Sequence, residues 1–128
     1  MGSKRIGALG VFGGLALTTG LAVATVCPAS ANDKSVSLTA PGGSVHSVVS
    51  WDDSVDTLCL TLKSTAAGAT SNADMTLGGR QVAHLEVSPS HRKSCTGNLS
   101  IAEDQLAKAT IYGGTNTWWK SVSGSYYT

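Results

Sequence analysis

The 128-residue chain contains little of what usually identifies a function. It has three cysteines and one phenylalanine, and only 13% of its residues are charged, with nine Lys or Arg against eight Asp or Glu. No stripe of basic residues is present to neutralise a row of phosphates. Nucleic acid is therefore not an expected partner.

Recognisable catalytic and metal-binding motifs are also missing. The chain has no G-x-S-x-G, no H-E-x-x-H and no pair of cysteines at zinc spacing. A hydrolase needs a nucleophile or activated water, a base within hydrogen-bond reach and a group that stabilises developing charge. Because no local pattern combines these, we expect a protein that is not an enzyme and holds no cofactor or metal.

The N-terminal residues have the pattern of an export signal. A short basic head precedes an apolar stretch from Ile6 to Val26, and the small residues Ala29 and Ala31 frame a cleavage site. Glycines and threonines interrupt the stretch, so it is a poor membrane span although it nearly reaches the ~20 residues that a spanning helix needs. We predict a signal peptide over residues 1–31, a secreted, extracellular domain over residues 32–128, and no stable membrane anchor.

Cys27 lies near the end of the apolar stretch and has a second interpretation. A bacterial lipoprotein signal also places a cysteine after its apolar run, with a small residue before it at the processing site. This chain has Val26 at that position. We therefore expect Cys27 to be removed with the signal peptide.

Two cysteines, Cys59 and Cys95, then remain in the exported domain. In an oxidising compartment two cysteines most simply form one disulfide. The chain-entropy model predicts that a bridge of this span destabilises the unfolded state by about 4 kcal/mol. That is a large share of the ~5–15 kcal/mol by which a typical domain is stable, so we expect a structural staple rather than catalytic thiols.

The rest of the chain alternates between apolar and polar residues with a period of two, which is typical of β-strands. The segments "SVSLTA", "VHSVVSW" and "TLCLTLKS" are separated by the turns "PGGS" and "DDSVD". The segment "TSNADMTLGGRQVAHLEVSPS" predicts a hairpin, because a Gly-Gly pair tolerates the positive φ angles of a tight turn. Short strands divided by turns predict an all-β fold in one domain, a small antiparallel β-sandwich of the immunoglobulin-like kind.

One strand brings two patterns into conflict. Leu58, Leu60 and Leu62 lie on one face of the segment, and Cys59 lies on the other. A disulfide directed into the core would turn the leucines outward. Either the strand is covered on both faces, or the bridge lies on the outer face of its sheet.

Residues 102–109 carry the signals of two kinds of element. Ser100 can serve as a helix N-cap with Glu103 three residues later, which favours a short helix over residues 102–109. The alternation of Ala107 and Ala109 with polar neighbours favours a strand instead. The sequence leaves both open.

The C-terminal segment "TNTWWKSVSGSYYT" is the richest recognition feature. Exposed aromatic side chains stack on sugars or anchor a protein partner, since they bring a large contact area at low entropic cost. Adjacent tryptophans point to opposite faces of a strand, so we expect Trp118 in the core and Trp119 at the surface. His91 and Arg92 belong to a basic turn that precedes Cys95 and are added to these aromatic residues. The binding candidates are therefore Trp118, Trp119, Tyr126, Tyr127, His91 and Arg92.

Two further polar patterns are weaker. His84 and Glu86 lie two apart on the outer face of a predicted strand and could act as an acid–base pair or bind a metal, but exposed polar residues of many strands share this spacing. The turn "DDSVD" begins like a calcium loop, but Thr57 stands where that loop has its glycine and Lys63 where it has its glutamate. We expect surface residues in the first case and a plain acidic turn in the second.

Several short stretches together resemble the small secreted proteins of actinomycetes that have one cysteine pair and no assigned activity. These stretches are the "ASA" that ends the signal, the strand "DTLCLTL", the later "SCTGNLSI" and the terminal "SYYT". The group includes exported protease inhibitors of similar size, which have more cysteines and a reactive loop held by a bridge. The resemblance implies a secreted, disulfide-stapled domain.

These observations lead to one expectation and two alternatives. We expect a secreted, non-enzymatic binding or structural protein of the cell envelope or extracellular medium, whose partner is an unknown protein or a cell-wall carbohydrate. The first alternative is an inhibitor of a secreted protease or glycosidase that exposes the loop from Ser88 to Ser94. The second is a small hydrolase that uses His84 and Glu86.

Overall fold

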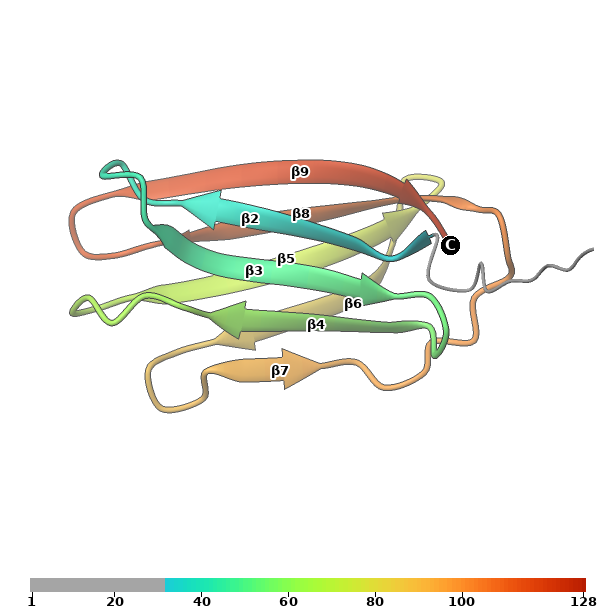
Figure 1. Ribbon diagram of the computed structural model, residues 1–128, viewed down its shortest axis with the longest axis horizontal. Helices are drawn as coiled ribbons and strands as arrows, with labels where there is room; N and C mark the ends of the chain where they lie inside the picture. The colour runs from blue at the N-terminus through green and yellow to red at the C-terminus, as the bar shows by residue number, and fades with distance from the viewer. Residues whose placement is uncertain (1–31) are drawn as a thin grey trace, which may run out of the picture. The chain divides into compact units, whose positions relative to one another are not determined.

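The computed structural model describes residues 32–128, which form two four-stranded antiparallel sheets (Figure 1). The predicted signal peptide, residues 1–31, lies outside the described residues, and Cys27 lies outside them with it. In the part of the chain that the structure describes, no helix is long and apolar enough to span a membrane.

The order of the strands produces a sandwich with three crossings between its sheets. One sheet has the order β2-β3-β4-β7 and the other β6-β5-β8-β9. The chain crosses after β4, returns for β7 and crosses again before β8. The strands are β2 Lys34–Thr39, β3 Val45–Asp52, β4 Thr57–Leu62, β5 Thr70–Leu77, β6 Arg80–Val87, β7 Lys93–Cys95, β8 Leu106–Gly114 and β9 Trp119–Tyr127.

The predicted all-β antiparallel sandwich with one disulfide is confirmed. The architecture of two packed sheets is the one that immunoglobulin domains share, and the strand order differs from theirs. In an immunoglobulin domain the second strand pairs with the fifth. Here the second described strand, β3, pairs with its sequence neighbours β2 and β4.

The core lies between the inner faces of the two sheets. Leu58, Leu60 and Leu62 of β4 are fully buried, and they pack toward the other sheet, where Met75 of β5 and Ile111 of β8 are equally buried. β2 lies against β8 and β9, while β4 lies against β5 and β6. Complete burial of one such side chain contributes about 1.5–3 kcal/mol, so the alternating apolar residues are sufficient reason for the two sheets to pair.

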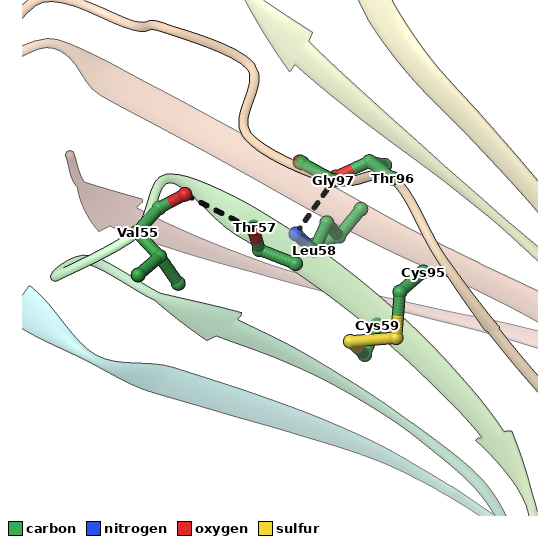
Figure 2. The surroundings of a disulfide bond; sticks show 7 residues. All are labelled: Val55, Thr57, Leu58, Cys59, Cys95, Thr96 and Gly97. Atoms are coloured by element: carbon green, nitrogen blue, oxygen red, sulfur yellow. Dashed lines mark hydrogen bonds between the residues drawn. A yellow bond between two sulfur atoms is a disulfide. The ribbon is translucent and has the colours of Figure 1, made fainter.

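The disulfide joins β4 to the short edge strand β7 (Figure 2). Cys59 faces Cys95 directly, and main-chain hydrogen bonds join Thr96 to Leu58 and Leu62 to Arg92. In an antiparallel pair these bonds alternate, so the cysteines occupy a non-hydrogen-bonded position, where facing Cα atoms come closest. Their Cα atoms are 4.1 Å apart.

The location of the bridge resolves the conflict within β4. The leucines of this strand are buried, while Cys59 is half-buried and Cys95 is exposed. The bridge therefore lies on the outer face of the β2-β3-β4-β7 sheet. It links two strands of one sheet and leaves the contact between the sheets entirely non-covalent.

Of the two elements left open for residues 102–109, the strand is observed and the short helix is not, because β8 begins at Leu106 and residues 102–105 before it contain a turn. Asp104 has a positive φ of 61°, which interrupts any right-handed helix. The hydroxyl of Thr128 donates to Ala102 O at 3.0 Å, and the Thr128 main-chain NH donates to Gln105 O at 2.9 Å. Pairing with the end of β9 thus overrides the local helix signals.

Candidate functional site

The outer face of the β6-β5-β8-β9 sheet, called the aromatic face below, carries three exposed aromatic side chains. Trp119 is 57% exposed, Tyr127 is 56% exposed and Tyr112 is 37% exposed. Tyr112 faces Ser121 across β8 and β9, which makes it the diagonal neighbour of Trp119. Aromatic side chains reach one another over such a diagonal, so Tyr112 and Trp119 form one exposed patch at one end of the face.

The turn from β8 to β9 sets the direction of both tryptophans. The main-chain NH of Thr115 donates to Trp118 O at 3.0 Å, and Gly114 has no room for a Cβ because the same carbonyl oxygen occupies that space. Trp118 is half-buried, and its ring meets that of His46 edge-on with centroids 4.9 Å apart. Trp118 thus packs inward and Trp119 points outward, as the alternation of a strand predicts.

His46 is the buried anchor beneath this turn. Its side chain is fully buried, and Nε2 donates to Thr70 O at 2.9 Å, which ties β3 to the start of β5. Its Nδ1 has no hydrogen-bond partner among the described residues. The contact holds the Trp118 turn against the end of the sandwich, so the aromatic patch rests on a packed support.

A hollow lies beside the aromatic patch, across β5 and β6. Its lining includes Asn72, Glu86 and His91. In the sheet register Asn72 faces Tyr112 on one side and Glu86 on the other. Because adjacent strands are about 4.8 Å apart, Asn72 and Glu86 of the hollow lie roughly 5–10 Å from Tyr112 on the same sheet face. Rings and polar groups are therefore available to one ligand.

A row of three titratable side chains crosses β5 and β6 next to this hollow. Nδ1 of His84 lies 2.5 Å from Asp74 Oδ1, and its Nε2 lies 2.9 Å from Glu86 Oε2. The hydrogen bond to Asp74, followed by the one to Glu86, raises the pKa of His84 above the usual 6.5. Both carboxylates favour the doubly protonated ring, which can donate to each of them.

Sequence reasoning identified His84 and Glu86 and missed Asp74. Pairing outward from the Gly78-Gly79 turn, Leu77 faces Arg80, and an unbroken register would place Ala83 opposite Asp74. A β-bulge between Met75 and Thr76 shifts the pairing by one residue and brings His84 there instead. The sequence contained one signal for this shift. Ala83 and Leu85 can face inward opposite Met75 and Ala73 only if the register moves by one residue.

The two binding candidates in the basic turn, His91 and Arg92, have different roles in the structure. Arg92 Nη2 donates to Leu62 O at 3.0 Å and to Ser64 O at 2.8 Å, so this guanidinium ties down the chain after β4 instead of facing a ligand. His91 is exposed and lines the hollow. Reciprocal main-chain hydrogen bonds between Ser88 and His91, each of 3.0 Å, close the proposed inhibitor loop into a tight turn.

The two C-terminal tyrosines lie on opposite faces of β9. Tyr127 is on the aromatic face, at the end opposite Trp119, whereas Tyr126 is only 6% exposed and packs near Trp51 with ring centroids 5.8 Å apart. This burial argues against Tyr126 as one of the binding candidates. Burial raises the pKa of its hydroxyl far above the usual range, and that hydroxyl has no hydrogen-bond partner in the described structure.

The remaining polar clusters have structural roles. In the calcium-like turn, Asp52 Oδ1 accepts hydrogen bonds from the main-chain NH and the hydroxyl of Ser54, and Asp56 Oδ2 accepts one from Ile101 N. Within residues 32–128 no group of three or more His, Cys, Asp or Glu side chains is placed to hold a metal ion.

The aromatic face is thus the arrangement with the most recognition chemistry in residues 32–128. It combines exposed rings, a hollow and polar side chains that face solvent. Comparison of the chain with protein-family models, with curated proteins and with solved structures finds no match.

Proposed function

We propose that the protein is a secreted, non-enzymatic binding protein of the cell envelope or the surrounding medium, and that its aromatic face binds cell-wall carbohydrate. The observation that carries the proposal is the exposure of Tyr112 and Trp119 as neighbours on one sheet face. Aromatic rings cover the apolar C–H face of a sugar, and nearby polar groups fix its orientation by hydrogen bonds.

The polar groups that such a ligand needs surround the rings. Ser121 faces Tyr112 from β9, Ser123 is the next outward residue of that strand, and Asn72 faces Tyr112 from β5. Hydroxyl and amide groups both donate and accept, which suits the hydroxyls of a sugar.

The outer face of the other sheet provides a contrast. Its outward positions include Ser35, Ser37, Ser50 and Thr61, and among residues 32–128 no exposed aromatic side chain lies on it. Both outer faces therefore supply hydroxyl groups, but only the aromatic face adds rings on which a sugar can stack. This asymmetry supports one binding face.

The disulfide supports the extracellular part of the proposal. Disulfides form and persist in oxidising compartments and are rare in the cytosol. The Cys59–Cys95 bridge is compatible with export, and the proposed signal peptide over residues 1–31 would supply the route.

Co-sedimentation with insoluble cell-wall polysaccharide tests the proposal. We expect the protein to sediment with the polymer and Trp119→Ala to bind roughly tenfold more weakly, because an aromatic contact is worth about 0.5–1.5 kcal/mol beyond its buried area. Val55→Ala is the matched control, since Val55 is an exposed apolar residue in the turn between β3 and β4. Equal binding by Trp119→Ala and the parent protein would remove the aromatic face as the site.

A further inference from the structure

The end of the aromatic face that is remote from Trp119 carries a second pair of exposed apolar side chains. Leu106 of β8 faces Tyr127 of β9, and both are more than half exposed. A second hollow lies beside them, lined by Thr76, Lys108 and Ser125 and by the glycines of the β5–β6 turn. Each end of the face therefore has a hollow flanked by exposed apolar side chains.

The two ends are connected by the same two strands. Tyr112 and Leu106 are six residues apart on β8, and Trp119 and Tyr127 are eight apart on β9, so the ends are separated by roughly 20–27 Å at about 3.4 Å per residue. The outward residues between them are mainly hydroxylic, and Thr110 and Ser123 hydrogen-bond to each other across the strands at 2.8 Å. This distance exceeds the size of one sugar and matches an extended chain of several.

The charges of the face favour an uncharged ligand. Asp74 and Glu86 are both occupied by His84, whose charge offsets part of theirs when it is protonated. Lys108 lies on the next row, opposite Thr76 and Ser125, so a cation balances the remaining negative charge. Neither a polyanion nor a polycation would find a surface of opposite sign along this path.

We propose that the aromatic face is an elongated site for a linear, uncharged polysaccharide that lies along β8 and β9, with one subsite at Tyr112 and Trp119 and a second at Leu106 and Tyr127. The proposal rests on the proposed function and specifies its ligand. Two subsites on one rigid face bind one chain with higher affinity than either subsite alone, because the second contact is intramolecular.

Calorimetry with oligosaccharides of defined length tests this proposal. The probes are neutral β-1,4-linked gluco-oligosaccharides and N-acetylated chito-oligosaccharides from the dimer upward, with polygalacturonate as a charged comparison. We expect the affinity to rise at least tenfold from the dimer to a chain that spans the face, and then to stay constant, because further sugars find no subsite.

Two variants separate the subsites. Tyr127→Ala is expected to weaken binding of the spanning oligosaccharide about three- to tenfold and to leave dimer binding unchanged, whereas Trp119→Ala weakens both. Both side chains are exposed, so these variants should keep the fold, which circular dichroism can check.

The elongated site is refuted if the dimer and the spanning chain bind equally, if Tyr127→Ala has no effect on binding of the spanning chain, or if polygalacturonate binds best. If neither oligosaccharides nor insoluble wall polymer bind, the proposed function itself fails.

Discussion

Removal of the Cys59–Cys95 bridge measures its covalent contribution separately from core packing. The double substitution Cys59→Ala with Cys95→Ala deletes two sulfur atoms from the outer face of the β2-β3-β4-β7 sheet. The adjacent leucines of β4 hold the core side of the strand and are untouched. No internal cavity is created, so the stability that is lost should come from the freed loop.

The size of the loss follows from the length of that loop. The two cysteines are 36 residues apart in the sequence. The chain-entropy model predicts a contribution of about 4 kcal/mol at 25 °C for a loop of this length. In a domain of this size each kcal/mol shifts Tm by about 4–8 °C, so we expect Tm to fall by roughly 15–30 °C. Leu60→Ala, one residue away but inward, would cost about 2–5 kcal/mol through a cavity instead.

Equilibrium urea unfolding distinguishes these contributions. The oxidised parent protein, the same protein kept reduced, and the double variant are compared by tryptophan fluorescence. We expect the reduced protein and the double variant to unfold together, with a larger urea dependence than the oxidised protein, because an unbridged unfolded chain exposes more surface. A double variant less stable than the reduced protein by more than about 1 kcal/mol would show that the sulfur atoms pack in the core, and would refute the reasoning.

Three further substitutions test individual contacts. Tyr126→Phe should raise the free energy of unfolding by about 1 kcal/mol, since it removes a buried hydroxyl that has no hydrogen-bond partner within residues 32–128; a loss of stability in thermal unfolding would indicate that this hydroxyl is hydrogen-bonded in the parent protein. NMR titration should find the His84 pKa above 6.5, with Asp74→Asn lowering it more than Glu86→Gln. Because folding raises this pKa, the stabilisation by the His84 row is complete below about pH 6.5 and is lost as the pH rises through the raised value. Gly114→Ala should cost about 1–3 kcal/mol by urea unfolding, because its Cβ would collide with Trp118 O, whereas Gly42→Ala, with nothing within 4 Å of the added atom, should unfold like the parent protein.

Local alternation was sufficient to predict most of the core. In β4 every second residue is buried, and the β5–β6 hairpin turns at Gly78 and Gly79 as the glycine pair predicts. Both glycines have positive φ angles, which other residues rarely adopt. Where the period is two and the turn residues are unambiguous, the sequence determines the strand and its inner face.

The features that sequence reasoning missed or left open depend on how separate segments of the chain pair. The turn before β8 is held by hydrogen bonds to Thr128, and no pattern within residues 102–109 predicts that contact. Arg92 was predicted to face a ligand. Its guanidinium instead binds main-chain oxygens 28 and 30 residues away, a contact that no local pattern indicates. The partner of His84 depends on a bulge, and a shift of one residue in register changes every facing pair.

The candidate site was predictable in part for the same reason. The outward direction of Trp119 follows from its position in a strand, but the convergence of Trp119, Tyr112 and the hollow on one face depends on which strands become neighbours. Tyr112 precedes Trp119 by only seven residues, yet no spacing rule links a tyrosine before a turn to a tryptophan after it. Only the strand order brings the two side chains to one surface.

The bridge within a single sheet also determines how the domain would respond to a mechanical load. If residues 32–128 are pulled from their two ends, tension passes from β4 through the sulfur atoms to β7, and the chain between the two cysteines carries none of it. A separation of 36 residues at 3.3–3.6 Å each keeps about 120–130 Å of contour length out of the extended chain. A reductant would release this length at constant force. A domain tethered to a wall polymer would thus extend in two stages, with the β5–β6 hairpin inside the part that stays slack until the bridge is opened.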